Sequence, residues 1–169
     1  MELRGREVIL RATTPEDAPA LAAILAEPEV ARWWGDFDLE RVLDDLIDSE
    51  PTDLPFVIEH DGRIVGYIQA VEELESDFRH AGIDLFLRTD AQGRGLGPDA
   101  IRTLAIELID GRGHHRLTID PAADNVHAIA AYAKLGFQPV GRMRAYQRLR
   151  DGRWVDGLLM DLLADDLVR

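Results

Sequence analysis

The sequence contains no cysteine among its 169 residues. Disulfide bridges, thiolate nucleophiles and cysteine-based zinc sites are therefore excluded, and the composition is compatible with a reducing compartment. Long apolar runs are missing as well. None approaches the roughly 20 residues that cross a bilayer, and no apolar segment follows the charged N-terminus to form a signal peptide. We expect a cytoplasmic protein with no membrane partner.

Positive charge is scarce in this chain. Nineteen Lys and Arg residues stand against 32 Asp and Glu, which gives a formal net charge of -13. Nucleic-acid binding needs clustered basic residues to displace counterions from phosphates, so the balance argues against a nucleic-acid partner. It favours a cationic partner, although acidity also serves solubility alone. The length and the 46% apolar content predict a single domain, residues 1–169, with a core that needs no metal.

The apolar pattern predicts strands alternating with helices. A strand over Val8–Ala12 precedes a helix whose start is marked by Thr14 as N-cap, with Pro15 and Asp17 following. The later elements are a helix after Asp38, a hairpin of Phe56–Glu59 and Ile64–Val71 around Asp61-Gly62, a strand Ile83–Leu87, a helix from Pro98 to near Gly111, a strand Leu117–Ile119, a helix Val126–Leu135 closed by Gly136, and a hairpin of Gln138–Arg148 and Trp154–Leu162. This order indicates one α/β domain.

A glycine-rich loop, Gln92-Gly93-Arg94-Gly95-Leu96-Gly97, lies between a predicted strand and a predicted helix. Glycines let a phosphate approach the backbone without meeting a Cβ atom, and the helix dipole adds about 0.3–1 kcal/mol for an anion at the helix start. The loop has neither the Gly-Lys-Ser/Thr ending of a P-loop nor the position and spacing of a Rossmann fingerprint. By itself it indicates an anion site or only a tight turn.

Two motifs give the loop a more specific meaning. Gln92-x-x-Gly95-x-Gly97, after an aliphatic strand, resembles the acetyl-CoA loop of the GNAT acetyltransferase superfamily. Asn125-x-x-Ala128-Ile129-x-x-Tyr132-x-Lys134-x-Gly136-Phe137 resembles the second cofactor helix of that superfamily. The resemblance implies a GNAT-like α/β fold, with a central mixed sheet that splays at the cofactor site and carries helices on both faces. It also implies an N-acetyltransferase that uses acetyl-CoA and no metal.

The same resemblance implies roles for particular residues. Tyr132 would lie near the CoA sulfur as a general acid for the departing thiolate, although an ordinary core tyrosine would show the same helical spacing. The residues implied to bind the cofactor are Phe86 and Leu87 through their backbone, the loop residues Gln92, Gly93, Arg94, Gly95, Leu96 and Gly97, and the helix residues Asn125 and Lys134.

Amine acetylation requires a base, because an alkyl amine with a pKa near 10.4 is less than about 0.1% neutral at pH 7. Asp84 is the first candidate, since it is a charged residue inside an otherwise apolar strand, where an unpaired charge would be costly. Its alternative is to face solvent or to pair with Arg88. Asp120, at the end of the next strand, is the second candidate, with turn formation as its alternative. Glu72 can hold a cation or belong to a solvated rim.

Within the superfamily, most of the chain resembles the aminoglycoside 6'-N-acetyltransferases. The shared stretches are Val8–Arg11, Val30–Gly35, Gly66-Tyr67 with Gln69, Gly82–Asp84, and Thr118–Pro121 with Asn125. In that family the aspartates matching Asp84 and Asp120 contact the amino sugar, and the first is the proposed base. The segment matching Trp33-Trp34 lies near the acceptor pocket, although simple packing is the alternative for both tryptophans. The implied acceptor is a polycationic amine, first of all an aminoglycoside.

Two departures from that family keep other acceptors open. The loop between Glu72 and Gly82 lacks the tryptophans of better-known members, and Gly141–Leu163 looks more like the ribosomal-protein N-terminal acetyltransferases. A protein N-terminus or a polyamine is therefore an alternative acceptor, and a CoA-binding regulatory domain is the alternative without catalysis. The five histidines show no metal-site spacing and are expected to be solvated. A monomer and a homodimer both fit, since an unpaired terminal strand permits pairing between copies.

Overall fold

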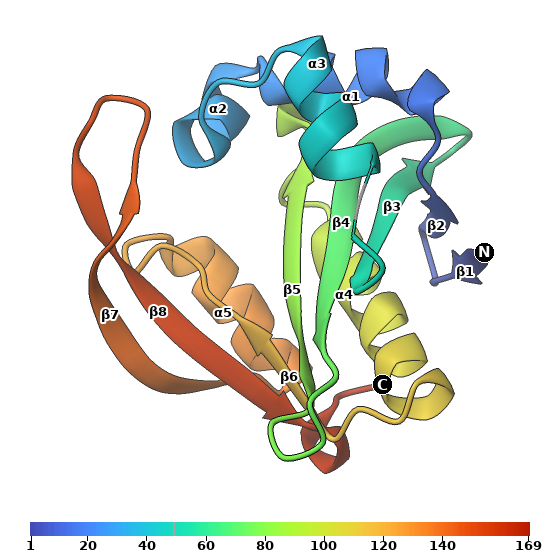
Figure 1. Cartoon of the computed structure of the whole chain (residues 1–169), viewed down its shortest axis with the longest axis vertical. Coiled ribbons are helices and arrows are strands. Elements are labelled where there is room, and N and C mark those ends of the chain that lie inside the picture. The colour runs from blue at the N-terminus through green and yellow to red at the C-terminus, as the bar shows by residue number, and fades with distance from the viewer. Residues whose placement is uncertain (49) are drawn as a thin grey trace.

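The computed structural model describes residues 1–48 and 50–169, in which the strands form one eight-stranded mixed sheet (Figure 1). In sheet order β1-β2-β3-β4-β5-β6-β8-β7, the strands are β1 (Glu2–Arg4), β2 (Ile9–Ala12), β3 (Asp53–His60), β4 (Arg63–Glu73), β5 (His80–Leu87), β6 (Arg116–Ile119), β8 (Trp154–Leu163) and β7 (Gln138–Arg148). The helices are α1 (Ala18–Leu25), α2 (Pro28–Trp34), α3 (Leu39–Val42), α4 (Leu96–Ile106) and α5 (Val126–Leu135). Wider helical turns at Leu43–Ile47 and Glu107–Gly111 extend α3 and α4. No helix in these ranges is long and apolar enough to cross a membrane.

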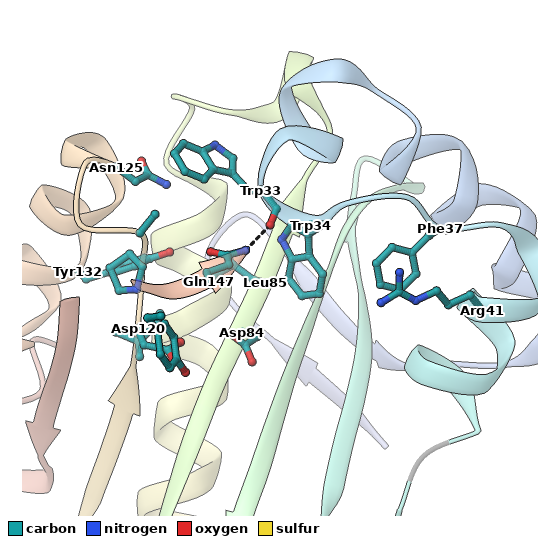
Figure 2. Close-up of a pocket in the computed structure, with 14 residues that line it drawn as sticks. Trp33, Trp34, Phe37, Arg41, Asp84, Leu85, Asp120, Asn125, Tyr132 and Gln147 are labelled. Atoms are coloured by element: carbon teal, nitrogen blue, oxygen red, sulfur yellow. Dashed lines mark hydrogen bonds between the residues drawn. The ribbon is translucent and has the colours of Figure 1, made fainter. Parts of the chain in front are cut away.

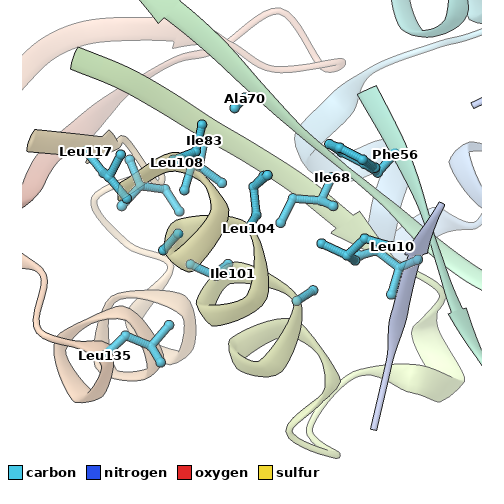
Figure 3. Close-up of a cluster of buried hydrophobic side chains, with 14 of the residues drawn as sticks. Leu10, Phe56, Ile68, Ala70, Ile83, Ile101, Leu104, Leu108, Leu117 and Leu135 are labelled. Carbon is cyan, nitrogen blue, oxygen red and sulfur yellow. The ribbon is translucent and has the colours of Figure 1, made fainter. Parts of the chain in front are cut away.

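The two faces of the sheet carry separate cores. On one face, Ile101 and Leu104 of α4 and Leu108 of the wider turn that extends it pack against strand residues such as Ile68 (Figure 3). On the other face, α1, α2 and α3 pack against Val57, Tyr67 and Phe86. The division follows from the alternation of side chains along a strand, which sends neighbouring residues to opposite faces. The predicted mixed sheet with helices on both faces is confirmed.

The sheet splays between β5 and β6, which are parallel neighbours. The two strands pair only through Ala81 with Leu117 and Gly82 with Thr118. On its other side β5 pairs with β4 over its whole length, from His80 to Leu87. Beyond Gly82, β5 therefore has no strand partner on the β6 side within the described sheet. The splay expected from the resemblance is confirmed.

Several local predictions are confirmed by the backbone. Asp61 and Gly62 have φ angles of 50° and 72°, as a tight hairpin turn requires. Asp17 closes a capping box with Thr14, whose backbone N–H donates to Asp17 Oδ2 at 2.8 Å. Gly136 ends α5 with a φ of 110°. These residues fix where the elements begin and end.

Two elements were not predicted, and the start of a third is wrong. The two missed elements are β1 and the helix α2, which ends in Trp33-Trp34. The helix α4 begins at Leu96 with Gly95 as its N-cap, so Pro98 is its third residue and not its first. Proline is tolerated there because the first backbone N–H groups of a helix have no partner within the helix.

Candidate active site

Two cavities open where β5 and β6 separate. Their volumes are about 440 Å³ and 720 Å³. The residues that line both cavities are Trp33, Trp34, Leu85, Asn125 and Tyr132. The cavities therefore meet between α2, β5 and α5. The residues that line the smaller cavity are drawn in Figure 2.

The larger cavity is bordered by the glycine-rich loop. Gly93 and Gly95 have φ angles of 70° and 81°, which side chains other than glycine rarely adopt. A Cβ atom at either residue would meet nothing within 4 Å, so the cavity side of the loop is open. Across residues 1–48 and 50–169, no backbone oxygen accepts from the N–H groups of Gly93, Arg94 or Gly95. The loop therefore presents free donors at the start of α4, as an anion site requires.

The acidic residue that follows the loop points away from it. Asp99 is 4% exposed, and its Oδ2 accepts hydrogen bonds from the backbone N–H groups of Glu7, at 2.8 Å, and Val8, at 3.2 Å. Arg102 Nη1 lies 3.3 Å from Asp99 Oδ1. The negative charge is thus neutralised on the far side of α4 and does not oppose an anion at the loop.

The helix α5 presents one face to both cavities. Asn125 is its N-cap, and Asn125 Oδ1 accepts from the backbone N–H of Ala128 at 3.3 Å. Tyr132 lies two turns further on, where the cavities meet. Burial raises the pKa of Tyr132 well above its usual value, and the charges of Asp84 and Asp120 act in the same direction. The phenol is therefore protonated at neutral pH and can serve as a proton donor.

Asp84 projects from β5 into the smaller cavity (Figure 2). Burial raises its pKa to about 6, the charge of Asp120 adds to this rise, and a hydrogen bond from Gln69 opposes it. The Asp84 side chain is exposed to this cavity, and the cavity itself is recessed between β5, α2 and α5. Arg88 does not pair with it, because Arg88 Nη2 lies 3.1 Å from Asp90 Oδ2. Asp84 is thus a carboxylate whose pKa suits a base near neutral pH.

Asp120 follows β6 and faces the same cavity, where the hydroxyl group of Tyr146 donates to its Oδ2. This hydrogen bond, with burial, raises the pKa of Tyr146 to about 12. Tyr146 stands on a bulge of β7: the register with β8 shifts between Met143 and Gln147, and Ala145 has a φ of 45°. The bulge turns the phenol into the cavity.

Tyr146 was not predicted from the sequence. One signal was available, which is the glycine Gly157 inside a predicted strand. A Cβ atom at Gly157 would lie 2.7 Å from Tyr146 Cδ1, so the glycine makes room for the ring. A glycine within a strand often marks such a close approach, although it does not name the partner.

The hairpin of β7 and β8 also reaches across to the helices that wall the smaller cavity. Gln147 Nε2 donates to the backbone oxygen of Trp33 at 2.5 Å, and Arg150 Nε lies 3.0 Å from Asp36 Oδ1. Trp34 lines the cavity and also packs against the core, where its ring meets the ring of Phe86 edge-on with centroids 5.0 Å apart. The cavity is therefore lined by two carboxylates and by aromatic side chains from α2 and β7.

Glu72 lies away from both cavities. It is 7% exposed, and its carboxylate lies 2.9 Å from Arg112 Nη1 and 2.7 Å from His114 Nε2. A buried carboxylate needs such partners. His114 is only 1% exposed, so the prediction of a solvated histidine is wrong for this residue. The structure does not bring Glu72 to the site for which it was predicted.

The other predicted residues lie close together, with two exceptions. Along the larger cavity lie Phe86, Leu87, Gln92, Gly93, Gly95, Gly97, Asn125 and Lys134, and around the smaller one lie Trp33, Trp34, Asp84 and Asp120. The exceptions are Leu96, which is 2% exposed and belongs to the core, and Arg94, whose Nη2 lies 3.4 Å from His60 Nε2. Tyr132 stands at the junction of the two groups.

Comparisons with known proteins agree with this geometry. The family model described as an acetyltransferase (GNAT) domain matches residues 7–138. Aminoglycoside N(6')-acetyltransferase type 1 from Klebsiella pneumoniae is 28% identical over 151 residues, which cover 79% of this chain and 75% of that protein. Mycobacterium smegmatis RimJ in complex with CoA-disulfide is 26% identical, with a TM-score of 0.84 over 100% of this chain and 88% of that one.

A second solved structure is AAC(6')-Ib in complex with paromomycin and acetyl-CoA. It is 26% identical, with a TM-score of 0.79 over 95% of each chain. The family match covers most of the chain, and it includes β5, the glycine-rich loop and α5. The chain belongs to the GNAT acetyltransferase family and is an acetyl-CoA-dependent N-acetyltransferase.

Proposed function

We propose that this enzyme acetylates a primary amine of a cationic small molecule, and that the molecule is an aminoglycoside acetylated at its 6'-amino group. The observation that carries the proposal is the pair of carboxylates, Asp84 and Asp120, in a cavity that meets the larger cavity at Tyr132. The 28% identity to the Klebsiella pneumoniae aminoglycoside acetyltransferase supports this acceptor.

The larger cavity fits acetyl-CoA. The free N–H groups of Gly93 and Gly95 suit its pyrophosphate, because no Cβ atom stands between the backbone and the cavity. The unpaired side of β5 at Phe86 and Leu87 suits the extended pantetheine arm, which would add to the sheet as a strand does. Asn125 and Lys134 border the same cavity from α5. When bound, acetyl-CoA supplies an activated acetyl thioester.

Asp84 and Tyr132 divide the proton transfers of the reaction. Asp84 binds the acceptor ammonium and takes a proton from its nitrogen, directly or through water. The nitrogen forms a bond to the carbonyl carbon, the carbon–sulfur bond breaks, and Tyr132 gives a proton to the sulfur. The nitrogen loses two protons in all, of which one is balanced at the sulfur and the other is released to solvent.

Asp120, Tyr146 and the tryptophans of α2 bind the remainder of the acceptor. Asp120 attracts a second cationic group. Trp33 and Trp34 line the same cavity, and indole rings suit both cations and the apolar faces of sugar rings, as Arg32 over the Trp33 ring at 4.7 Å illustrates. The net charge of -13 favours the approach of a polycation over longer distances.

A protein N-terminus is the second candidate acceptor. The observation that favours it is the resemblance of Gly141–Leu163 to the ribosomal-protein N-terminal acetyltransferases, because this segment includes most of the β7–β8 hairpin beside the smaller cavity. An amino-terminal ammonium would bind Asp84 in the same manner.

A panel of amines tests the choice of acceptor. Release of free CoA at pH 7.5 is measured with aminoglycosides that carry a 6'-amino group, with aminoglycosides that carry a 6'-hydroxyl group, with spermidine and with short peptides. Turnover with the 6'-amino compounds alone is expected. Turnover with peptides and with no aminoglycoside would favour the second candidate. Binding of acetyl-CoA without turnover on any amine would favour a regulatory CoA-binding domain.

A further inference from the structure

A buried tyrosine on β4 is linked to Asp84 through one glutamine. Tyr67 is 0% exposed, and its hydroxyl oxygen lies 2.8 Å from Gln69 Oε1 and 3.1 Å from the backbone oxygen of Leu46. Burial raises the pKa of Tyr67 well above its usual value, with further contributions from Asp53 and Asp84. Its hydroxyl group therefore keeps its single proton, and the nearer of the two acceptors for that proton is Gln69 Oε1.

Gln69 stands directly opposite Asp84 in the register of β4 and β5. Directly opposed residues of antiparallel strands place their side chains on one face, with Cβ atoms about 4.5–5.5 Å apart. A glutamine amide has an acceptor end and a donor end. Since Tyr67 engages the oxygen of the Gln69 amide, its nitrogen is the end left available to donate to the Asp84 carboxylate. That bond opposes the effect of burial on Asp84.

We propose that Tyr67 and Gln69 are positioning residues for the base. Tyr67 fixes the orientation of the Gln69 amide, and Gln69 holds the Asp84 carboxylate by one donated hydrogen bond. The inference rests on the role proposed above for Asp84. Without the Tyr67 hydroxyl group, the amide is free to turn its oxygen toward the carboxylate, which would place two acceptors against each other.

The ring and the hydroxyl group of Tyr67 have separable roles. The ring stacks on the ring of Phe86, with centroids 5.4 Å apart and an angle of 19° between the planes. The replacement Tyr67→Phe keeps this packing and removes only the hydroxyl group. Gln69 is half-buried, so Gln69→Leu removes the donor without opening a hole in the core.

Other ionisable groups also surround Asp84. The smaller cavity holds Asp120 from the end of β6, Tyr132 from α5, Tyr146 from β7 and Arg41 from α3. Asp53 on β3 acts on Tyr67 from the other side. All of them are present in both variants, so a change shared by the two variants reports the link through Gln69.

The test is the pH dependence of kcat/KM from pH 5 to 9, measured with the amine of the panel that turns over fastest. Gln69→Leu should raise the apparent pKa of the acid limb by about one pH unit, because a hydrogen bond to the charged carboxylate is lost. At pH 5 this lowers kcat/KM by about tenfold, with little change at pH 8.5. Tyr67→Phe should move the limb in the same direction by less. The double variant should match Gln69→Leu, because Tyr67 acts through Gln69.

A matched control lies on the opposite face of the same strand. Ile68→Val also removes packing from β4, but it should keep the wild-type acid limb. Wild-type limbs in both Gln69→Leu and Tyr67→Phe, together with an inactive Asp84→Asn, would refute the link and leave Asp84 as the base. Wild-type rates and limbs in Asp84→Asn would overturn the base and the link together. If Tyr67→Phe does not fold, Gln69→Leu alone decides.

Discussion

Replacing Asp84 by asparagine removes the proposed base and nearly preserves the shape of the side chain. Burial, and then the charge of Asp120, raises the pKa of Asp84 to about 6. At pH 7.5 about 97% of the molecules would therefore carry an ionised base. Asparagine accepts no proton, so the amine must lose its first proton to water. An amine with a pKa near 10.4 is only about 0.1% neutral at that pH, so kcat/KM should fall by about 100- to 1000-fold.

The shape of the pH profile should change together with the rate. Wild-type kcat/KM is expected to rise through pH 6 and then to level off, because activity requires the deprotonated carboxylate. In Asp84→Asn it should instead rise about tenfold per pH unit toward the pKa of the amine. The assay is CoA release at saturating acetyl-CoA from pH 5.5 to 9.5, with calorimetric binding of acetyl-CoA as the check that the donor site is intact.

Asp120→Asn is the matched control for this experiment, since it removes a carboxylate from the same cavity. It should weaken acceptor binding and keep the shape of the profile. Its acid limb should move to lower pH, because the charge of Asp120 helps to raise the pKa of Asp84. The reasoning would be refuted by an Asp84→Asn variant that is within about fivefold of the wild type at pH 7.5 and levels off above pH 6.

Three further substitutions have distinct expected outcomes. Tyr132→Phe should lower kcat by about 10- to 100-fold and leave the dissociation constant of acetyl-CoA within about twofold, as compared by steady-state kinetics and calorimetry. Gly66→Ala should cost more than about 2 kcal/mol in urea unfolding, because its Cβ atom would meet the backbone oxygen of Phe86. Asp17→Ala should lower the free energy of unfolding by about 2–3 kcal/mol at pH 7, since it removes a capping box and the 2.8 Å ion pair with Arg11. Burial favours a higher pKa for Asp17, but Arg11 holds that pKa below its usual value. The difference in stability between the wild type and Asp17→Ala should therefore shrink as the pH falls below about 4, as followed by thermal melts.

Elements with local signals at their ends could be predicted from the sequence. The predicted bounds of α5 match the structure because Asn125 caps its start and Gly136 its end. The helix α2 could not be predicted in this way. It has seven residues and no side-chain hydrogen bond at its N-cap, and its buried residues are Val30 and Ala31. Such a short helix is stabilised by tertiary packing, which the local sequence does not reveal.

The site could be predicted only where a motif or a strand pattern points to it. Asp84 stands out as a charge in an apolar strand, and Tyr132 belongs to a motif. Tyr146 depends on a bulge in β7, on Ala145 at a positive φ and on space at Gly157, and these conditions combine only in the folded chain. Glu72 was placed wrongly because its partner His114 is 42 residues away, and no local pattern joins them.

Among the described residues, the hairpin of β7 and β8 contributes to the smaller cavity but not to the larger one, so sequence changes in the hairpin affect the two cavities differently. Gln147 meets Trp33 across 114 residues of sequence, and these two residues line the acceptor cavity. In the described chain, no residue of either hairpin strand lines the larger cavity, whose last lining residue is Lys134. Substitutions and length changes in the hairpin can therefore remodel the smaller cavity, while the glycine-rich loop and the rest of the larger cavity away from Trp33 keep their form. The same fold can in this way change its acceptor specificity without any change in the residues that bind the cofactor.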